Sequence, residues 1–268
     1  MPSLETSARD GVLRITLNRP EVHNAMDPEM VVRLADTWDA FRNDDSLRVA
    51  IVTGAGERAF SSGADLKRLI PLTTGARPPE DEWDRRVMAD MSCAGRAFLR
   101  AEPLYKPIIA AVNGFCLAGG TELIEACDLR IAATHATFAL TEVKRGLIPI
   151  AGSLVRLARQ IPYAHAMEIL LMGEAIDAEH ALRIGLVNRV VPAAELMATA
   201  ERFATVLAAN GPLALRKVKE AVLRTSGVPM KEAFEIESAC GAEVWRSEDA
   251  REGPRAFVEK RLPRFTGR

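Results

Sequence analysis

The chain has 268 residues, of which 48% are apolar and 26% are charged, and its formal net charge at neutral pH is −1. This length allows a large hydrophobic core, and the near-zero net charge gives no global electrostatic case for binding nucleic acid or an anionic membrane surface. The cysteines are scattered without a Cys-x-x-Cys pair, which favours buried thiols in a reducing compartment over disulfides or a zinc site.

Charged residues interrupt the N-terminal segment before the apolar core of a signal peptide can form. The longest charge-free run, residues 107–121, has 15 residues, whereas a membrane span needs about 20 apolar residues. We therefore expect a cytoplasmic protein without a membrane segment. The histidines show no ligand spacing, so we expect no metal site; they are His23, His135, His165 and His180.

Strand and helix patterns alternate in the first part of the chain. Short apolar runs predict buried strands at residues 12–17, 49–53, 108–112, 129–133 and 187–191. The pair Asp27-Pro28 is typical of a helix start, and Trp38, at helical spacing behind it, is expected in the core. Residues 69–80, rich in proline, predict an irregular and mobile loop. A helix over residues 81–100 should follow.

Helical patterns dominate the rest of the chain and are the only pattern beyond Pro192. The predicted helices are residues 153–160, 164–172, 178–184, 194–209, 213–225 and 230–245, with a final segment from Ser247. Alternation followed by helices alone favours an α/β core, residues 1–192, with a helical region, residues 193–268. The last helices have apolar faces with little sequence left to cover them, so we expect burial between subunits. The residues of these apolar faces include Leu213, Val218, Val222, Phe234 and Ile236.

The stretch between residues 106 and 142 has the features of an anion-stabilising site. A buried strand leads into the pair Gly119-Gly120, and a helical pattern follows. The first turn of a helix has unpaired N–H donors and the positive end of the dipole, and glycine allows close approach of a ligand. Glu122 adds a carboxylate at this corner, and Glu142 follows twenty residues later, which suggests chemistry on a carbonyl compound. The residues alone leave open that the glycines form only a tight turn and that Glu122 is a solvated helix residue.

Motifs along nearly the whole chain resemble the crotonase superfamily, the enoyl-CoA hydratase/isomerase family. The matching segments are LNRP (17–20), FSSGADL (60–66), KPIIAAVNG (106–114), GGTEL (119–123), CD (127–128), Glu142 with GLIP (146–149), and AFVEKR (256–261). They occur in the order and at the spacings usual for that family. The resemblance implies an α/β spiral of strand–strand–helix turns. It also implies C-terminal helices that pack between subunits, in a homotrimer or a dimer of trimers.

The resemblance also assigns residues to an acyl-CoA thioester substrate. The backbone N–H groups of Ala64 and Gly119 would form an oxyanion hole around the thioester carbonyl, where fixed donors stabilise developing charge. The residues that would flank CoA are Glu21, Val22, His23, Ala64, Asp65, Leu66 and Lys67. Phe257 and Lys260 match positions that reach the nucleotide end of CoA, often from a neighbouring subunit. The sequence alone also allows Asp65 to be a helix cap.

Glu122 and Glu142 match the two acids of true hydratases. In a hydratase both carboxylates hold the attacking water, the residue at Glu142 delivers a proton to the α-carbon, and Glu122 assists water activation. We therefore expect an enoyl-CoA hydratase that needs no cofactor, since CoA is part of the substrate. Two alternatives stay open: an enoyl-CoA isomerase of the same fold, which works with one carboxylate, and a non-catalytic acyl-CoA-binding or scaffolding protein.

The chain departs from the family pattern in three segments. The common Pro-Gly-Ala-Gly-Gly phrase is here PIAGS, residues 149–153, and the branched Ile150 beside the expected acyl site puts the usual chain-length preference in doubt. Leu140 stands where some hydratases carry a polar residue, so the hydrogen bonding around Glu142 is expected to differ. Ala118 replaces a frequent glycine, which we expect to have little consequence for the N–H donors.

Overall fold

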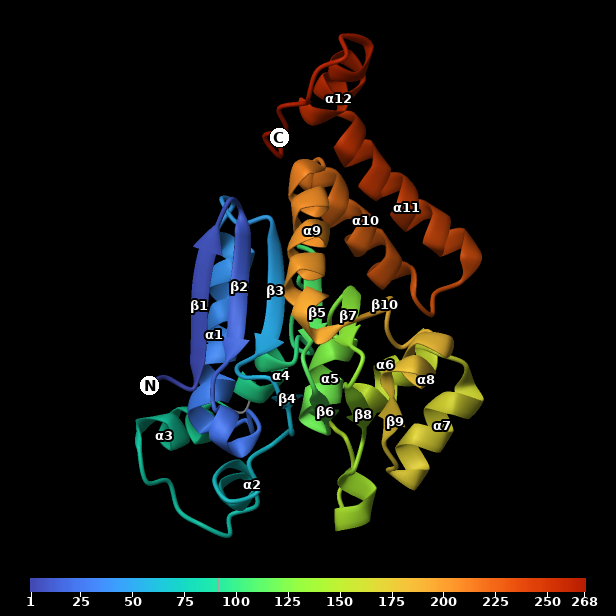
Figure 1. Ribbon diagram of the computed structural model, residues 1–268. Coiled ribbons are helices and arrows are strands. Elements are labelled where there is room, and N and C mark those ends of the chain that lie inside the picture. The colour runs from blue at the N-terminus through green and yellow to red at the C-terminus, as the bar shows by residue number, and fades with distance from the viewer. Residues whose placement is uncertain (91) are drawn as a thin grey trace.

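A six-stranded sheet forms the centre of the molecule in the computed structural model, which describes residues 1–90 and 92–268 (Figure 1). Its strands, in spatial order, are β1 (Leu4–Arg9), β2 (Val12–Leu17), β3 (Val49–Gly54), β5 (Ile108–Val112), β7 (Leu129–Ala133) and β10 (Arg189–Val191). The first two strands form an antiparallel hairpin, and all the other neighbours pair in parallel. Parallel neighbours need crossover connections, and the chain uses these to build the second sheet and the helices.

A second, four-stranded sheet lies beside the first. Its strands are β4 (Ala59–Ser61), β6 (Phe115–Leu117), β8 (Thr137–Ala139) and β9 (Ile176–Asp177). Each of β3, β5 and β7 is followed within a few residues by one short strand of this sheet, and a helix follows later in each connection. The expected repetition of strand, strand and helix is therefore present.

Helices cover both faces of the large sheet. Successive residues of a strand point to opposite faces, so β3 sends Ala50 and Val52 to the main core and Val49 and Ile51 to a second cluster. The main core includes α1 (Pro28–Asn43) and α4 (Cys93–Ala97), and the second cluster is closed by α9 (Leu196–Ala209). Burial on both faces explains why these strands read as continuous apolar runs.

The start of α1 agrees with its sequence signals. The Asp27 side chain accepts a hydrogen bond from the Met30 N–H at 2.8 Å, so it caps the helix as expected. Trp38 is wholly buried, and its indole N–H donates to the Ala97 carbonyl at 3.0 Å. The prediction that Trp38 belongs to the core is therefore confirmed.

All four cysteines are free and buried, as their spacing indicated.

The predicted continuous helix over residues 81–100 is wrong. The segment forms α3 (Glu82–Ala89) and α4, and the chain leaves the helical conformation at Asp90. The Asp90 carboxylate accepts from the N–H and the hydroxyl of Ser92, a local contact that competes with helix hydrogen bonding. Residue 91, which also belongs to the predicted helix, lies outside the described residues.

The loop predicted over residues 69–80 is also more structured than expected. It contains the short helix α2 (Leu69–Thr73), and the side chain of Leu72 in this helix is buried. Arg77 donates to the buried Asp84 carboxylate at 2.8 Å, and this hydrogen bond with the Arg77 charge lowers the pKa of Asp84 to about 2. An ion pair that composition does not reveal thus ties the segment to α3.

The remaining helices lie within two or three residues of their predicted bounds. They are α5 (Gly119–Glu125), α6 (Ser153–Gln160), α7 (Tyr163–Met172) and α8 (Ala178–Arg183). Three 3-10 turns were not predicted: η1 (Pro20–Val22), η2 (Glu142–Arg145) and η3 (Ala193–Glu195). Five strands were not predicted: β1, β4, β6, β8 and β9. Four of these have two or three residues, too few to show alternation, and β1 buries only its first residue.

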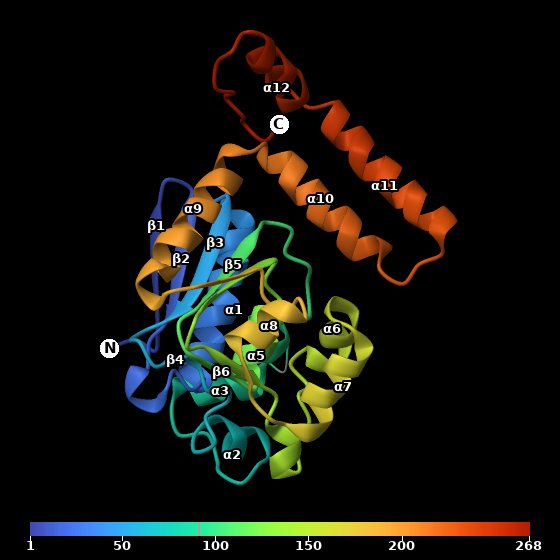
Figure 2. The ribbon, with the colours of Figure 1, turned by 45° about the vertical axis from the view of Figure 1, so that its right-hand side comes forward.

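The C-terminal helices project from the body of the molecule as an arm (Figures 1 and 2). The arm consists of α10 (Pro212–Thr225), α11 (Met230–Trp245) and α12 (Asp249–Val258). No residue of α10 is buried, and Val218, Val222 and Phe234 are exposed within the single chain. Although α9 follows residue 192, it packs on the sheet, so the projecting part begins with α10. Across the described ranges, no helix combines the length and apolar character that crossing a membrane requires.

Candidate active site

The turn between β6 and α5 is tight and conformationally unusual. Ala118 has φ 50° and ψ −124°, a region that residues with a Cβ rarely occupy. Its N–H donates to the Ala139 carbonyl at 2.7 Å, which holds the turn against β8. We expected alanine in place of the frequent glycine to be of little consequence for the donors. The structure adds a cost that the sequence did not show, because such backbone strain is worth about 1–3 kcal/mol.

The loop after β4 meets this turn and brings two backbone donors together. A Cβ at Gly63, which has φ 89°, would lie 2.9 Å from the Gly119 nitrogen, so only glycine fits. A Cβ at Gly119 would in turn lie 3.7 Å from the Ala64 nitrogen. Within residues 1–90 and 92–268, neither the Ala64 N–H nor the Gly119 N–H has a backbone acceptor. The two predicted oxyanion-hole donors therefore lie side by side and are free.

Glu122 lies one turn into α5 and is buried. One carboxylate oxygen, Oε1, accepts from the Ser153 N–H at 3.3 Å, at the point where α6 begins. The pKa of Glu122 is raised to about 7, mainly by burial and in part by the charge of Glu142, while hydrogen bonds from the backbone N–H groups of residues 151–153 act in the opposite direction. The alternative of a solvated helix residue is thus excluded by the fold.

Glu142 is the first residue of η2 and is half-buried. Its Oε2 is a buried atom for which the described part of the chain offers no hydrogen-bond partner. The neighbouring Leu140 is wholly buried and supplies no donor. Burial raises the pKa of Glu142, and the charge of Arg145 partly offsets this. The charge of Glu142 in turn contributes to the raised pKa of Glu122.

The segment expected to flank CoA after the first strands is fixed against the Ala64 loop. His23, with φ 55°, ends η1, and its carbonyl accepts from the Ser62 N–H at 2.9 Å. Its ring packs edge-on against Phe115, with ring centroids 6.0 Å apart. The structure therefore brings the segment of Glu21, Val22 and His23 beside the segment that begins at Ala64. Glu21, Val22, Leu66 and Lys67 are exposed there.

Asp65 has a different environment from its neighbours. Its carboxylate accepts from the N–H groups of Lys67 and Arg68, at 2.8 and 3.0 Å. It also accepts from the Arg19 guanidinium at 2.8 Å. The side chain is buried and caps a turn. The sequence allowed a helix cap instead, but the N-cap position of α2 is Arg68. Its contacts hold the loop that carries Ala64.

Phe257 and Lys260 do not approach Glu122 within one chain. Phe257 is on α12 and 85% exposed, and Lys260 follows that helix. Both lie at the end of the arm, whereas α5 lies in the body of the molecule (Figures 1 and 2). A contact of these residues with an acyl-CoA bound at Glu122 therefore requires a second subunit.

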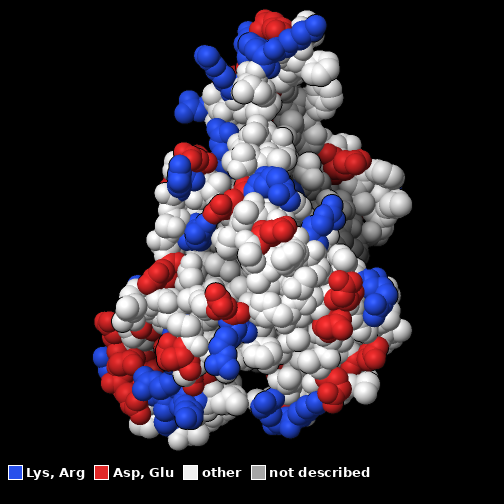
Figure 3. All heavy atoms as spheres, viewed as in Figure 1, with Lys and Arg blue, Asp and Glu red and all other residues white. Residues whose placement is uncertain are grey.

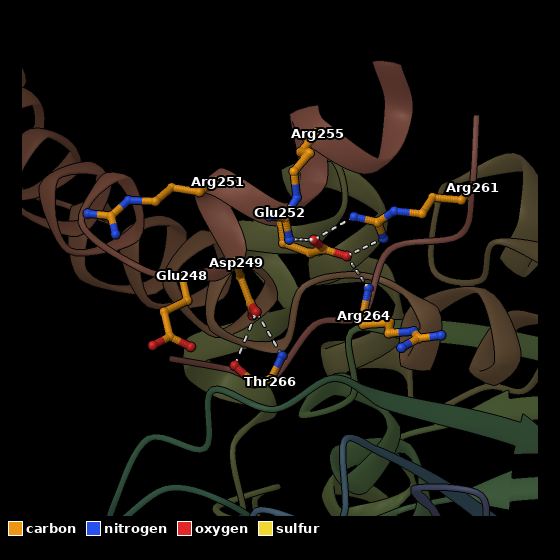
Figure 4. Close-up of a pocket in the computed structure, with 8 residues that line it drawn as sticks. All are labelled: Glu248, Asp249, Arg251, Glu252, Arg255, Arg261, Arg264 and Thr266. Carbon is orange, nitrogen blue, oxygen red and sulfur yellow. Dashed lines mark hydrogen bonds and ion pairs between the residues drawn. The ribbon is translucent and has the colours of Figure 1, made fainter. Parts of the chain in front are cut away.

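A cavity of about 580 Å³ lies beside α12 (Figure 4). Its lining is charged: Glu248, Asp249, Arg251, Glu252, Arg255, Arg261, Arg264 and Thr266. Glu252 pairs with Arg255 and Arg261, which hold its pKa below the usual range, and Asp249 accepts from the Thr266 and Gly267 N–H groups. These contacts fold the C-terminal tail onto α12. The cavity contains none of the paired buried carboxyls, so we assign it a structural role.

The surface is mixed in charge and opens near the candidate site. On the face shown in Figure 3, basic and acidic side chains are interspersed, without a field of one sign. In the same view the surface is hollowed between the lobe that carries α2 and the lobe that carries η2.

In the ranges 1–90 and 92–268, no group of three or more His, Cys, Asp or Glu side chains is placed to hold a metal ion.

Sequence reasoning missed several residues around Glu122. The Phe98 ring touches Gly119, 3.4 Å from where a Cβ would be, and Arg156 of α6 donates to the carbonyls of Phe98 and Leu99 at 3.0 and 2.7 Å. Glu125, one turn after Glu122, is 2% exposed. A second acid in an otherwise apolar stretch of helix was the signal that could have identified Glu125. The contacts of Phe98 and Arg156 had no such signal.

Comparisons with known proteins identify the family of this chain. Residues 7–268 match the family described as enoyl-CoA hydratase/isomerase. The chain is 40% identical over 267 residues to enoyl-CoA hydratase EchA19 of Mycobacterium tuberculosis, covering 100% of this chain and 97% of the relative. It is 39% identical to (E)-benzylidenesuccinyl-CoA hydratase of Thauera aromatica, covering 96% of each. The solved enoyl-CoA hydratase of Bacillus anthracis superimposes with a TM-score of 0.89 at 36% identity, covering 99% and 100% of the two chains.

The fold is that of the crotonase superfamily, as the sequence motifs predicted. Within that superfamily, the chain belongs to the enoyl-CoA hydratase/isomerase family and is an enzyme of that family. The sequence-based predictions of the family and of a mixed α/β fold with a C-terminal helical region are confirmed.

Proposed function

We propose that this enzyme adds water across the double bond of a trans-2-enoyl-CoA to give a 3-hydroxyacyl-CoA. The observation that carries the proposal is the pairing of Glu122 and Glu142, two carboxyls with raised pKa values, the first of them in the helix that begins at the free backbone donor Gly119. The second free donor, Ala64, lies beside Gly119. The printed names of the relatives from M. tuberculosis and T. aromatica, both hydratases of CoA esters, support this reaction.

The backbone donors serve the thioester. The free N–H groups of Ala64 and Gly119 would bond the thioester oxygen, and they favour the negative charge that develops there when hydroxide adds to the β-carbon. The packing of Gly63 against Gly119 fixes both donors before substrate arrives. Preorganised donors of this kind need no rearrangement during the reaction, so their full strength acts on the transition state.

The two carboxyls divide the proton transfers. Glu122, faced by the N–H groups of the first turn of α6, acts as the base that takes a proton from the attacking water. Glu142, whose buried Oε2 is without a partner among the described residues, gives a proton to the α-carbon. The oxygen–carbon bond forms at the β-carbon as the double bond is consumed. The proton taken up by Glu122 then returns to Glu142 through solvent, so each turnover adds one water and leaves both carboxyls as they began. This balance requires no cofactor.

The surroundings suit an apolar acyl group and an assembled enzyme. Leu147, Ile148 and Ile150 follow η2 and are exposed, so they offer apolar surface close in the chain to Glu142. We place Phe257 and Lys260 at the nucleotide end of CoA bound by a neighbouring subunit, in a cytoplasmic homotrimer or dimer of trimers. The free apolar faces of the arm support that assembly.

Mixing the protein with crotonyl-CoA tests the proposal directly. Hydration removes the conjugated enoyl thioester absorbance, and the product can be identified as 3-hydroxybutyryl-CoA. Tight binding with an unchanged spectrum would instead identify a non-catalytic acyl-CoA-binding protein. A 3-enoyl-CoA that gains conjugation, with no hydration of crotonyl-CoA, would identify an isomerase. Turnover measured over a series of enoyl-CoA chain lengths then establishes the acyl chain-length preference, which we expect Ile150 to influence.

A further inference from the structure

A third acidic side chain, Glu125, lies behind the proposed pair and has no role in the steps above. It is on the same helix as Glu122 and is 2% exposed. Its Oε1 accepts a hydrogen bond from the Ser153 hydroxyl at 2.9 Å. Its Oε2 is buried and finds no partner among the residues that the structure describes. A buried carboxyl that is only half satisfied is costly, so its presence calls for a physical account.

Ser153 connects this carboxyl to Glu122. Ser153 is the first residue of α6, and its N–H donates to Glu122 Oε1 while its hydroxyl donates to Glu125 Oε1. One residue therefore bonds both acids of α5. The serine occupies the last position of the PIAGS segment, where the family commonly has glycine, and glycine could not make the second bond. The position of the first turn of α6 relative to Glu122 thus depends in part on the Ser153–Glu125 contact.

The groups around Glu125 come from four elements. They are Glu122 on α5, Ser153, Arg156 and Gln160 on α6, Arg130 on β7, and Cys116 on β6, with Cys127 just after α5. The Arg130 guanidinium donates to backbone carbonyls and to Gln160 rather than to the Glu125 carboxylate. The pKa of Glu125 is raised to about 8. Burial is the main cause and the charge of Glu122 acts in the same direction, whereas Ser153, Arg130 and Arg156 act in the opposite direction. At neutral pH, Glu125 is therefore mostly protonated.

We propose that Ser153 and Glu125 are positioning residues for Glu122: their hydrogen bond holds the first turn of α6 against Glu122, and the proton on Glu125 keeps a second negative charge away from the reacting centre. The inference rests on the proposed hydration. Ionisation of Glu125 puts a negative charge one helical turn behind the base. That charge opposes the negative charge that develops on the thioester oxygen, so turnover falls as Glu125 loses its proton.

Turnover of crotonyl-CoA measured against pH tests this inference. For the wild type, we expect turnover to fall by about tenfold or more between about pH 7 and about pH 9.5. Glu125→Gln keeps an acceptor for Ser153 but cannot ionise, so its alkaline fall should be clearly smaller than that of the wild type. The part that remains belongs to Glu142, which must hold a proton to protonate the α-carbon. Ser153→Ala removes the donor that favours ionised Glu125, so the alkaline fall should move to higher pH. Turnover at neutral pH should also drop by about threefold to tenfold, because the bond that holds α6 is lost.

The matched control is Glu168→Gln, which removes an exposed glutamate on α7 and should keep the wild-type profile. All variants must retain the elution mass and unfolding temperature of a folded enzyme. An alkaline fall in Glu125→Gln equal to that of the wild type would overturn the proposal. A Ser153→Ala enzyme indistinguishable from the wild type would do so equally.

Infrared spectra of protein labelled at glutamate carboxyl carbons separate this inference from the proposed function. We expect protonated-carboxyl absorption at neutral pH, part of which is lost in Glu125→Gln, while the rest comes from Glu122 and Glu142. If Glu125→Gln removes part of this absorption but the wild type does not hydrate crotonyl-CoA, the proposed function is contradicted. If the wild type hydrates crotonyl-CoA but its absorption is unchanged by Glu125→Gln, the role of Glu125 is contradicted.

Discussion

Gly63 and Ala118 face each other with no room for a second side chain, since a Cβ on Gly63 would lie 2.6 Å from the Ala118 Cβ. This contact joins the loop after β4 to the turn before α5, and each segment carries one of the free donors. The distance between the Ala64 and Gly119 nitrogens is therefore controlled by a glycine that belongs to neither donor residue. Any change that separates the two segments should weaken the oxyanion hole without touching a carboxylate.

Gly63→Ala should consequently lower turnover by about 10²-fold, the usual effect of losing one oxyanion donor. The matched control is Gly75→Ala. Gly75 also has a positive φ, 74°, but its Cβ would meet nothing within 4 Å. The control experiences the backbone strain without the collision, so it should keep wild-type turnover. Equal turnover in the two variants, measured with crotonyl-CoA on protein of native mass, would refute this account of the contact.

Ala118→Gly should stabilise the protein. The substitution relieves the strained φ of 50°, worth about 1–3 kcal/mol, and loses about 0.5–1 kcal/mol to the greater chain entropy of glycine. A rise in the unfolding temperature is the expected net result. Ala126→Gly, at a C-cap of ordinary helical φ, should lower the unfolding temperature. If both variants lose stability, the conformation at Ala118 is not strained.

Stability should fall as pH rises between about 4.5 and 8. The pKa of Glu122 is raised from 4.5 to about 7 and that of Glu125 to about 8, chiefly by burial. The folded state thus keeps protons that the unfolded state has lost, so this contribution to stability is fully present below pH 4.5 and is lost by about pH 8. Asp84, whose pKa is lowered to about 2, affects the pH dependence of stability only in more acidic solution.

Calorimetry of the wild type and Glu125→Gln across this range measures the effect. The variant should have the flatter pH dependence and, near pH 8, the higher unfolding temperature, because Glu122 is then the only one of these two buried carboxyls that must ionise. Parallel curves for the two proteins would show that Glu125 has an ordinary pKa.

The arm should lose its partner subunits when its apolar face is made acidic. Val222 and Phe234 are exposed on neighbouring helices of the arm, so Val222→Asp and Phe234→Asp should each shift the elution mass toward a monomer. Arg9→Asp, at the exposed hairpin between β1 and β2, is the control that should keep the native mass. Wild-type protein that is monomeric and fully active at assay concentration would contradict the proposed assembly.

The long elements could be predicted from the sequence because their signals are local. The bounds of β2, β5, β7, α6 and α11 agree with the apolar runs and helical periods that predict them. The short strands of the second sheet could not, because a strand of two or three residues is defined by its neighbours rather than by its own pattern. The break in the helix at Asp90 could not be predicted for a related reason, since it depends on hydrogen bonds of the Asp90 side chain with Ser92 and Arg96.

The candidate site shows the same division. Glu122, Glu142, Ala64 and Gly119 follow from family motifs, and the structure places Ala64 beside Gly119. Ser153 belongs to a motif that was recognised, yet its link to Glu125 exists only because α6 meets α5 in space. Likewise the carboxylate of Asp65 is conspicuous in the sequence, but its bond to Arg19 spans 46 positions. Contacts of this kind depend on tertiary packing.

Hydration and isomerisation should respond differently to loss of the base. Hydration requires a water to be deprotonated while the α-carbon gains a proton, so two carboxyls are needed. Isomerisation removes and returns a proton, which one carboxyl can do. Glu122→Gln keeps the size of the side chain and removes the base. It should lower turnover of crotonyl-CoA by about 10²–10⁴-fold with little change in substrate affinity, because the lost interaction belongs to the transition state.

Glu142→Gln serves as the comparison because it removes the other carboxyl of the pair. It should damage both hydration of crotonyl-CoA and any conversion of a 3-enoyl-CoA, whereas Glu122→Gln should spare the conversion relative to hydration. The pH profile provides an independent check. The pKa of Glu122 is about 7, so hydration by the wild type should fall on the acid side of neutrality as the base gains a proton, and any residual activity of Glu122→Gln should lack that fall. Near wild-type hydration by Glu122→Gln would assign the base to another residue.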